Sequence, residues 1–150
     1  MLIHHRGIYH DRLDAPFVGT LIFAKDCHHH CPGCCHEGRH TTPIYEDDSV
    51  EIIKKVLDYG FSEGLVLGGF EWTEQPDELL ELIREAQLHK LKIILYTHHT
   101  EDSLRTMLPE LYSYKGIYVK YGEYREEEKS STNIQYGIPL ASENQYIKII

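Results

Sequence analysis

Residues 18–35 read VGTLIFAKDCHHHCPGCC, a short apolar run that leads directly into a stretch crowded with cysteine and histidine. The first part, Val18–Phe23, has the length and apolar character of a buried strand. The stretch from Lys25 to Thr42 is polar and rich in cysteine and histidine, so it cannot continue that strand. We therefore expect a buried strand followed by a loop over residues 25–42.

Downstream of this loop, helical and strand-like segments alternate. Asp48 followed by Glu51 resembles a capping box and Gly60 can end the helix, which places a helix at residues 49–59. Pro76 marks the start of a second helix. The other expected elements are strands at 64–67, 91–97 and 116–121, a short helix at 101–108 and a closing strand at 144–150. This alternation predicts a single compact α/β domain over residues 1–150 with a mostly parallel sheet.

In a parallel sheet of this kind, ligands bind beyond the carboxyl ends of the strands. The cysteine loop follows the strand at 18–23, and Gly68-Gly69 follows the strand at 64–67. Both segments are therefore expected at the same edge of the sheet, where we predict the functional site.

The composition argues against two classes of partner. With 24 acidic and 15 basic residues the chain has a formal charge of −9, and no basic cluster offsets it, so a phosphate backbone would be repelled. No apolar run reaches the roughly 18 residues that a membrane-spanning helix needs. The amino-terminal residues lack the features of a secretory signal. We expect a cytoplasmic protein that binds neither nucleic acid nor membrane.

The cysteines indicate a metal site. All four lie between residues 27 and 35, whereas a disulfide framework spreads its cysteines along the chain. Cys27, Cys31 and Cys34 have the spacing C-x3-C-x2-C, which allows each thiolate to bind one iron of a 4Fe-4S cluster while the fourth iron stays without a protein ligand. Zinc is the alternative, since cysteine and histidine also suit zinc. Cys35 is expected to be a small packed residue, and the histidines at 28–30 to be solvated.

At these residues the chain resembles the radical S-adenosylmethionine superfamily, whose signature is three cysteines with this spacing in the loop after the first strand. Pro32-Gly33 makes it similar to the activating proteins of anaerobic ribonucleoside-triphosphate reductase. Other segments echo that family in part: Gly68-Gly69-Phe70-Glu71-Trp72, Tyr96-Thr97-His98, Tyr121-Gly122-Glu123-Tyr124 and Ala141-Ser142-Glu143-Asn144-Gln145. In the family an acid and a proline follow the two glycines directly, whereas here Phe70 shifts the acid by one position and Trp72 replaces the proline. The resemblance implies a partial (βα) barrel-like sheet.

The resemblance also implies how S-adenosylmethionine binds, with its methionine amino and carboxylate groups on the open iron. Gly68 and Gly69, which lack Cβ atoms, would let the strand end approach the amino group, and Glu71 would pair with its positive charge. The alternative for Glu71 is a solvated loop acid.

Three further residues complete the expected cofactor site. By the family pattern, the backbone of Gly33 and Cys35 would line the adenine. Thr97 would hydrogen-bond the ribose or carboxylate, although an ordinary strand-end threonine is the alternative. Phe70 and Trp72 are expected in the core. No catalytic side chain beyond the cluster ligands is predicted.

The function implied by the resemblance is activation of a glycyl-radical enzyme by reductive cleavage of S-adenosylmethionine. The expected partners are a large glycyl-radical subunit, in the first place anaerobic ribonucleotide reductase, and an electron donor such as a flavodoxin. One alternative is a radical enzyme that acts on a small molecule. The other is a non-catalytic iron-sulfur or zinc-binding protein, which would need a fourth protein ligand for its metal.

Overall fold

A computed structural model describes residues 1–29, 36 and 38–150 of the chain. The α-helices are α1 (Ser49–Tyr59), α2 (Pro76–Leu88) and α3 (Glu101–Met107), and the 3-10 helices are η1 (Arg39–Thr41), η2 (Trp72–Glu74), η3 (Pro109–Ser113) and η4 (Glu126–Glu128). The strands are β1 (Leu2–Arg12), β2 (Gly19–Ala24), β3 (Tyr45–Asp48), β4 (Gly64–Gly68), β5 (Lys92–Tyr96), β6 (Tyr118–Tyr121), β7 (Ile134–Gln135), β8 (Ile138–Pro139) and β9 (Tyr146–Ile149).

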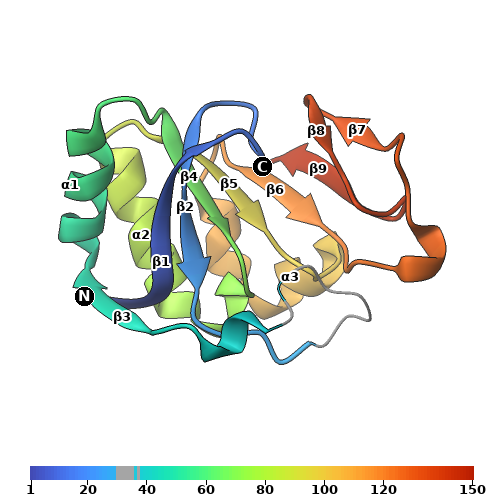
Figure 1. The fold of residues 1–150 in the computed structure, drawn as a ribbon, viewed down its shortest axis with the longest axis horizontal. Helices are drawn as coiled ribbons and strands as arrows, with labels where there is room; N and C mark the ends of the chain where they lie inside the picture. Colours follow the sequence, from blue (N-terminus) through green and yellow to red (C-terminus); the bar gives the residue numbers. More distant parts are fainter. Residues whose placement is uncertain (30–35, 37) are drawn as a thin grey trace.

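Seven of these strands form one mixed sheet in the order β3-β1-β2-β4-β5-β6-β9 (Figure 1). The central strands β2, β4, β5 and β6 are parallel neighbours, whereas β1, β3 and β9 pair antiparallel at the flanks. The predicted mostly parallel sheet is therefore correct only for the centre. A short loop joins β1 to β2, and such a loop can connect only antiparallel neighbours. β7 and β8 form a separate hairpin beside β9.

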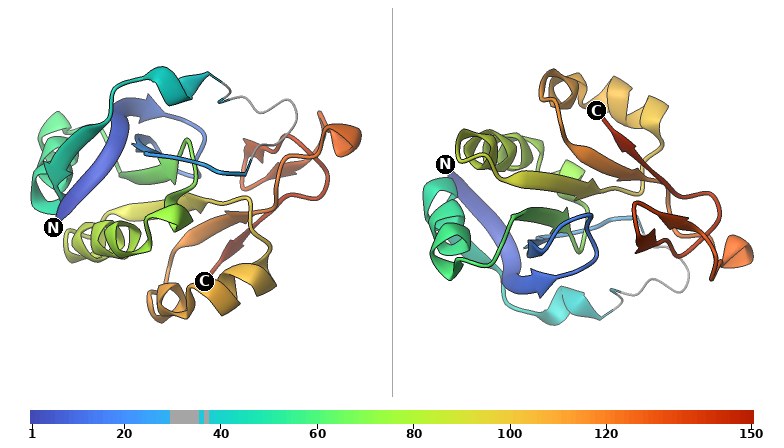
Figure 2. Two further views of the ribbon diagram at one scale, coloured as in Figure 1. Left: turned by 90° about the horizontal axis from the view of Figure 1, so that it is seen from below. Right: turned by 90° about the horizontal axis from the view of Figure 1, so that it is seen from above.

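The three α-helices cover one face of the curved sheet (Figure 2). Because successive parallel strands lie side by side, right-handed crossovers place all connecting helices on the same face. Helix α1 has the predicted bounds and caps: Asp48 accepts a hydrogen bond from the Val50 amide, and Gly60 ends the helix with a φ of +84°. The helices predicted at 76 and 101 are also present, and α3 ends one residue earlier than expected.

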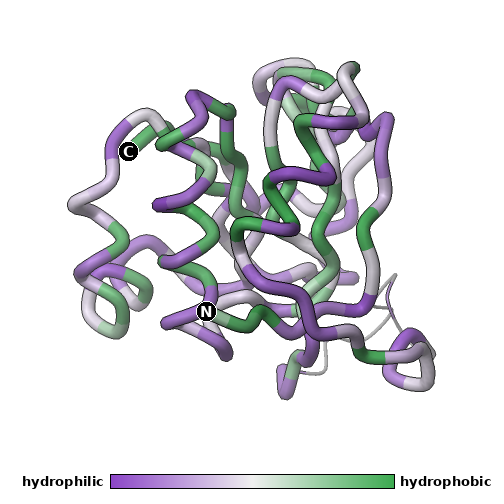
Figure 3. The backbone as a smooth tube through the Cα atoms, turned by 90° about the vertical axis from the view of Figure 1, so that its left-hand side faces the viewer, coloured by the Kyte–Doolittle hydropathy of each residue, from purple (hydrophilic) through white to green (hydrophobic). Residues whose placement is uncertain are grey.

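The hydrophobic core lies between the helices and the central strands. All residues of β2 and β4 are buried, as expected for strands covered on both faces. Strands β2, β4 and β5 are mostly apolar, whereas hydrophobic and hydrophilic residues alternate along α1 and α2 (Figure 3). In the described part of the chain, no helix combines the length and apolar character needed to cross a membrane. The barrel-like arrangement stays a prediction.

Candidate metal centre

The cysteine loop leaves the sheet at the carboxyl end of β2, beside the ends of β4 and β5 (Figure 1). Cys27 lies three residues after the end of this strand and is partly buried, and its Sγ donates to the carbonyl of His29 at 3.2 Å. Four other predicted site residues, Cys31, Gly33, Cys34 and Cys35, lie outside the described residues. Their proposed roles therefore stay predictions, while Cys27 lies at the expected edge of the sheet.

Arg6, a buried residue of β1, holds both ends of this loop. Its Nε donates to the carbonyl of Lys25 at 2.5 Å, and its Nη1 donates to the carbonyls of His40 at 3.1 Å and Thr42 at 2.5 Å. Its Nη2 also lies 3.4 Å from a carboxylate oxygen of Asp26. Since β1 lies between β2 and β3, the two strands that the loop connects, a single guanidinium reaches the residues that enter the loop and those that leave it.

Two buried phenylalanines support the returning half of the loop. Phe23 and Phe70 pack edge to face, with ring centroids 5.1 Å apart. His40 stacks on Phe70 at 4.1 Å, and His36 packs edge-on against Phe23 at 5.1 Å. The Arg6 guanidinium lies 5.6 Å from the Phe70 ring centroid. The position that departs from the family motif thus carries a ring on which the loop rests, and the prediction that it is a core residue is confirmed.

Trp72, the other departure, is also a core residue. Its side chain is fully buried, and its Nε1 donates to the carbonyl of Ile22 at 3.0 Å. This hydrogen bond links the turn after β4 to the neighbouring strand β2.

The two glycines at the end of β4, Gly68 and Gly69, differ in how strongly the structure requires glycine at their position. Gly69 has a φ of +82°, and a Cβ there would meet the Phe23 ring at 2.5 Å. Gly68 is less restricted, since a Cβ would lie 3.5 Å from the nearest side chain, that of Leu21. Packing therefore already requires glycine at position 69, and the predicted approach of a cofactor to either glycine stays a prediction.

Glu71 and Thr97 meet in a buried hydrogen-bond network. Glu71 is only 3% exposed, so its interpretation as a solvated loop acid is wrong. Its Oε1 accepts from the Thr97 hydroxyl at 3.1 Å and from the His98 amide at 2.8 Å, and its Oε2 accepts from the amide and hydroxyl of Thr73. The network joins the end of β4 to the end of β5. These contacts give Thr97 a structural role at the end of β5, and its contact with a cofactor stays a prediction.

A second set of side chains faces the same edge. The Cys27 Sγ, a carboxylate oxygen of Glu74 and a ring nitrogen of His98 lie within 4.8 Å of one another. The sequence analysis assigned no role to Glu74 or His98, although both closely follow strands β4 and β5, at the edge where the site was predicted. Burial lowers the pKa of His98, while the nearby Glu71 carboxylate opposes this effect.

The histidines of the loop pair with acids at its rim. His28 is 83% exposed in its side chain and contacts Glu74 through both its amide and its ring. The His29 Nε2 lies 2.6 Å from a carboxylate oxygen of Glu123, and this hydrogen bond lowers the pKa of Glu123. The ring of His29 stacks on that of His98 at 4.3 Å. The expectation that His28 and His29 are exposed is correct, while His30 lies outside the described residues.

A cavity of about 460 Å³ adjoins this edge of the sheet. His98 lines it and also belongs to the set around Cys27, so the cavity lies next to the cysteine loop. On its wall, the Oδ1 of Asn144 is buried and has no hydrogen-bond partner among the described residues, while its Nδ2 donates to the carbonyl of Glu123 at 2.8 Å. The volume is within the range that small-molecule ligands occupy in proteins.

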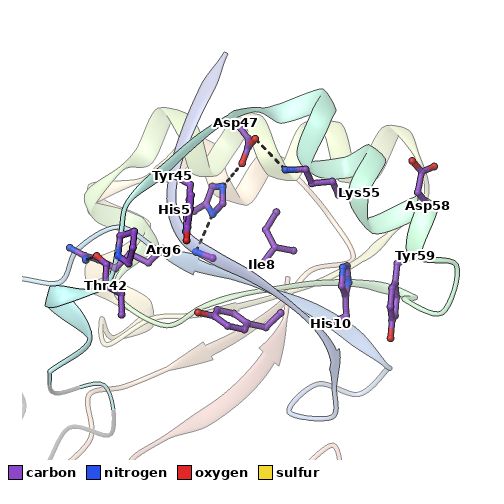
Figure 4. Close-up of a pocket in the computed structure, with 13 residues that line it drawn as sticks. His5, Arg6, Ile8, His10, Thr42, Tyr45, Asp47, Lys55, Asp58 and Tyr59 are labelled. Atoms are coloured by element: carbon purple, nitrogen blue, oxygen red, sulfur yellow. Dashed lines mark hydrogen bonds and ion pairs between the residues drawn. The ribbon is translucent and has the colours of Figure 1, made fainter.

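Another cavity, of about 740 Å³, lies between β1, β3 and α1 (Figure 4). Its polar groups pair with one another: His5 and Lys55 both contact Asp47, and the ring of His10 stacks on Tyr59 at 4.0 Å. The described cysteine, Cys27, does not line it.

Comparisons with known proteins agree with the cysteine pattern. A family model described as a 4Fe-4S single cluster domain matches residues 16–148, which is most of the chain. A search of curated proteins found no match.

Proposed function

The chain belongs to the family of 4Fe-4S single cluster domains, and from this premise we propose that it is a radical S-adenosylmethionine enzyme. One observation carries the proposal: a C-x3-C-x2-C loop begins at the carboxyl edge of the sheet, beside a cavity of about 460 Å³. Three cysteine ligands leave one iron without a protein ligand, and the cavity offers space for a small molecule next to it. We also propose a partial (βα) barrel-like domain, because the central strands β2, β4, β5 and β6 are parallel neighbours.

The residues of the chain fit such a cluster. Cys27, Cys31 and Cys34 supply three thiolates, the ligands that iron-sulfur clusters use. Arg6 holds the ends of the loop together through the chain's own carbonyl groups, independently of any metal. The loop is therefore partly organised before a cluster is bound, which lowers the entropic penalty of bringing the thiolates together.

When bound, the cluster would supply the electron for reductive cleavage of S-adenosylmethionine. The protein's part is to bind and orient that molecule. Thr97, Gly68, Gly69 and the backbone of Gly33 and Cys35 are the proposed contacts. Glu71 holds Thr97 and the His98 amide in place. Each of its two carboxylate oxygens already accepts two hydrogen bonds, so a bound ammonium group would have to displace one of these donors.

For the reaction as a whole, we favour activation of a large glycyl-radical subunit, such as that of anaerobic ribonucleotide reductase, with a flavodoxin-like electron donor. The charge of −9 suits a partner with a basic docking surface. A radical enzyme for a small molecule is the second candidate, favoured by the cavity beside the loop.

The first experiment measures the cluster. Anaerobically reconstituted protein should contain about four irons and four sulfides per chain. Cys27→Ala, Cys31→Ala and Cys34→Ala should each lose the cluster, while the control Cys35→Ala should retain it. Absence of iron-sulfur absorption in wild-type protein that was freed of metal by a chelator before reconstitution would overturn the proposal, and loss of the cluster in Cys35→Ala would favour a four-cysteine electron carrier.

The second experiment measures the reaction. Protein reduced with dithionite should convert S-adenosylmethionine to methionine and 5′-deoxyadenosine. With a cognate glycyl-radical subunit added, an electron paramagnetic resonance doublet from the glycyl radical should form, and it should be absent with Cys31→Ala. Intact S-adenosylmethionine in the presence of a verified cluster would contradict the enzyme assignment. Cleavage without a doublet but with turnover of a small molecule would favour the second candidate.

A further inference from the structure

The set formed by Cys27, Glu74 and His98 combines three different metal-binding groups. A thiolate, a carboxylate and an imidazole are each common zinc ligands. Their ligand atoms lie within 4.8 Å of one another, compared with about 3.5 Å between the ligands of a tetrahedral zinc ion. Small side-chain movements would therefore bring all three onto one ion.

Neighbouring groups already orient these ligands. A carboxylate oxygen of Glu74 accepts a hydrogen bond from the His28 amide at 2.7 Å, which fixes that side chain at the rim. The ring of His98 lies between two other histidine rings, at 4.3 Å from His29 and 4.2 Å from His99.

The buried carboxylate of Glu71 lies close to the His98 ring. The Nε2 of His98 lies 3.6 Å from Oε1 of Glu71, which is almost fully buried. This separation is too long for a hydrogen bond, so the Glu71 carboxylate acts on the His98 ring through its negative charge, which favours a cation bound nearby. This contact and the cavity next to His98 distinguish the set from a chance group of surface side chains.

The surroundings favour a cation and allow it to enter. Three carboxylates, those of Glu71, Glu74 and Glu123, lie at this edge, and the whole chain carries a charge of −9. Glu74 and His98 are partly exposed, with side-chain exposures of 25% and 21%. An ion bound by these three ligands would keep a coordination position open to water.

We propose that Cys27, Glu74 and His98 bind one zinc-type divalent cation in the cluster-free protein, with water completing the coordination. Cys27 is also a proposed cluster ligand, so the cation and the cluster exclude each other. The cluster-free chain therefore has a defined metal-bound state, and the cation must dissociate before a cluster can assemble. Binding of the cation requires neither S-adenosylmethionine nor the proposed reaction.

The test uses the full chain, freed of metal by a chelator under anaerobic reducing conditions. Co²⁺ serves as a spectroscopic probe, because thiolate coordination to Co²⁺ gives a charge-transfer band, and Zn²⁺ affinity is measured by competition with a chromogenic chelator. The wild type should bind one Co²⁺ per chain and show that band. Glu74→Gln and His98→Gln should each weaken Co²⁺ and Zn²⁺ binding by at least about tenfold.

Two controls match these variants. His89→Gln and Glu46→Gln replace an exposed imidazole and an exposed carboxylate that are not part of the set. Both should bind Zn²⁺ within about twofold of wild type. Circular dichroism of each variant separates loss of a ligand from loss of folding. Because Glu74 lies on the surface, we expect the fold to tolerate Glu74→Gln better than His98→Gln.

Two outcomes would overturn the proposal. If Glu74→Gln and His98→Gln bind as tightly as wild type while Cys27→Ala does not, the cysteines alone hold the ion. If the wild type binds no Co²⁺ through a thiolate, no site exists. In the supporting case, Zn²⁺ added before reconstitution should slow cluster assembly in wild type more than in Glu74→Gln. None of these results depends on S-adenosylmethionine, so the proposed function can fail or hold separately.

Discussion

Replacing Arg6 by methionine should destabilise the protein strongly, even without a metal. Methionine keeps an unbranched side chain but removes every donor that contacts Lys25, His40 and Thr42. A hydrogen bond that involves a charged group contributes about 1.5–3 kcal/mol, and removing one partner of a buried charged group costs about 3–5 kcal/mol. The freed carbonyls belong to a surface loop and can regain water, so we expect the lower part of that range, about 3 kcal/mol. This is a large share of a typical stability of about 5–15 kcal/mol.

The assay is urea denaturation of the cluster-free protein, followed by the rate of iron loss to a chelator from the reconstituted protein. Arg105→Met is the matched control, because Arg105 is half-exposed and pairs with Glu101 on one helix. Such exposed pairs contribute less than about 1 kcal/mol. Arg6→Lys should fall between wild type and Arg6→Met, since one ammonium cannot reach both ends of the loop. If Arg6→Met loses no more stability than Arg105→Met, and loses iron no faster, Arg6 does not hold the loop.

Two further predictions concern the fold. Gly69→Ala should lower the free energy of unfolding by at least about 3 kcal/mol, and Gly60→Ala by about 1 kcal/mol. Both glycines have positive φ, but only at position 69 would a Cβ meet the Phe23 ring, so equal losses in urea denaturation would contradict this prediction. The hydrogen bond from Lys148 lowers the pKa of Glu101 in the folded protein, so it stabilises the fold above the ordinary carboxyl pKa, and this contribution is lost as pH falls. Glu101→Gln should therefore lower the free energy of unfolding by about 1 kcal/mol at pH 7. Between about pH 5 and pH 3, the free energy of unfolding of this variant should fall less steeply than that of wild type, which denaturation at several pH values would measure.

Local signals were sufficient to predict the helices and the parallel strands. The caps of α1 and the continuous apolar runs of β2 and β4 depend only on residues that are close together in the sequence. Strand β1 carries no such signal, because histidine, arginine and glycine interrupt its apolar residues and its register with β2 is irregular. Its pairing with β2 and β3 makes it a strand despite this composition.

The candidate site was predictable in part for the same reason. The cysteine spacing and the strand-end rule located it, and Cys27 lies where they placed it. The burial of Glu71 and the approach of Glu74 and His98 to Cys27 depend on contacts between segments that are far apart in the chain. Arg6 is the clearest case, since it contacts residues 19 to 36 positions away.

The ring of Phe70 beneath Arg6 and His40 has an evolutionary consequence. Positions 6 and 70 should change together among relatives. Chains that keep an aromatic residue after the paired glycines should keep arginine in the first strand, because the ring and the guanidinium support the same loop. Chains in which the acid follows the glycines directly lack that ring, and selection on the first-strand position should there be relaxed.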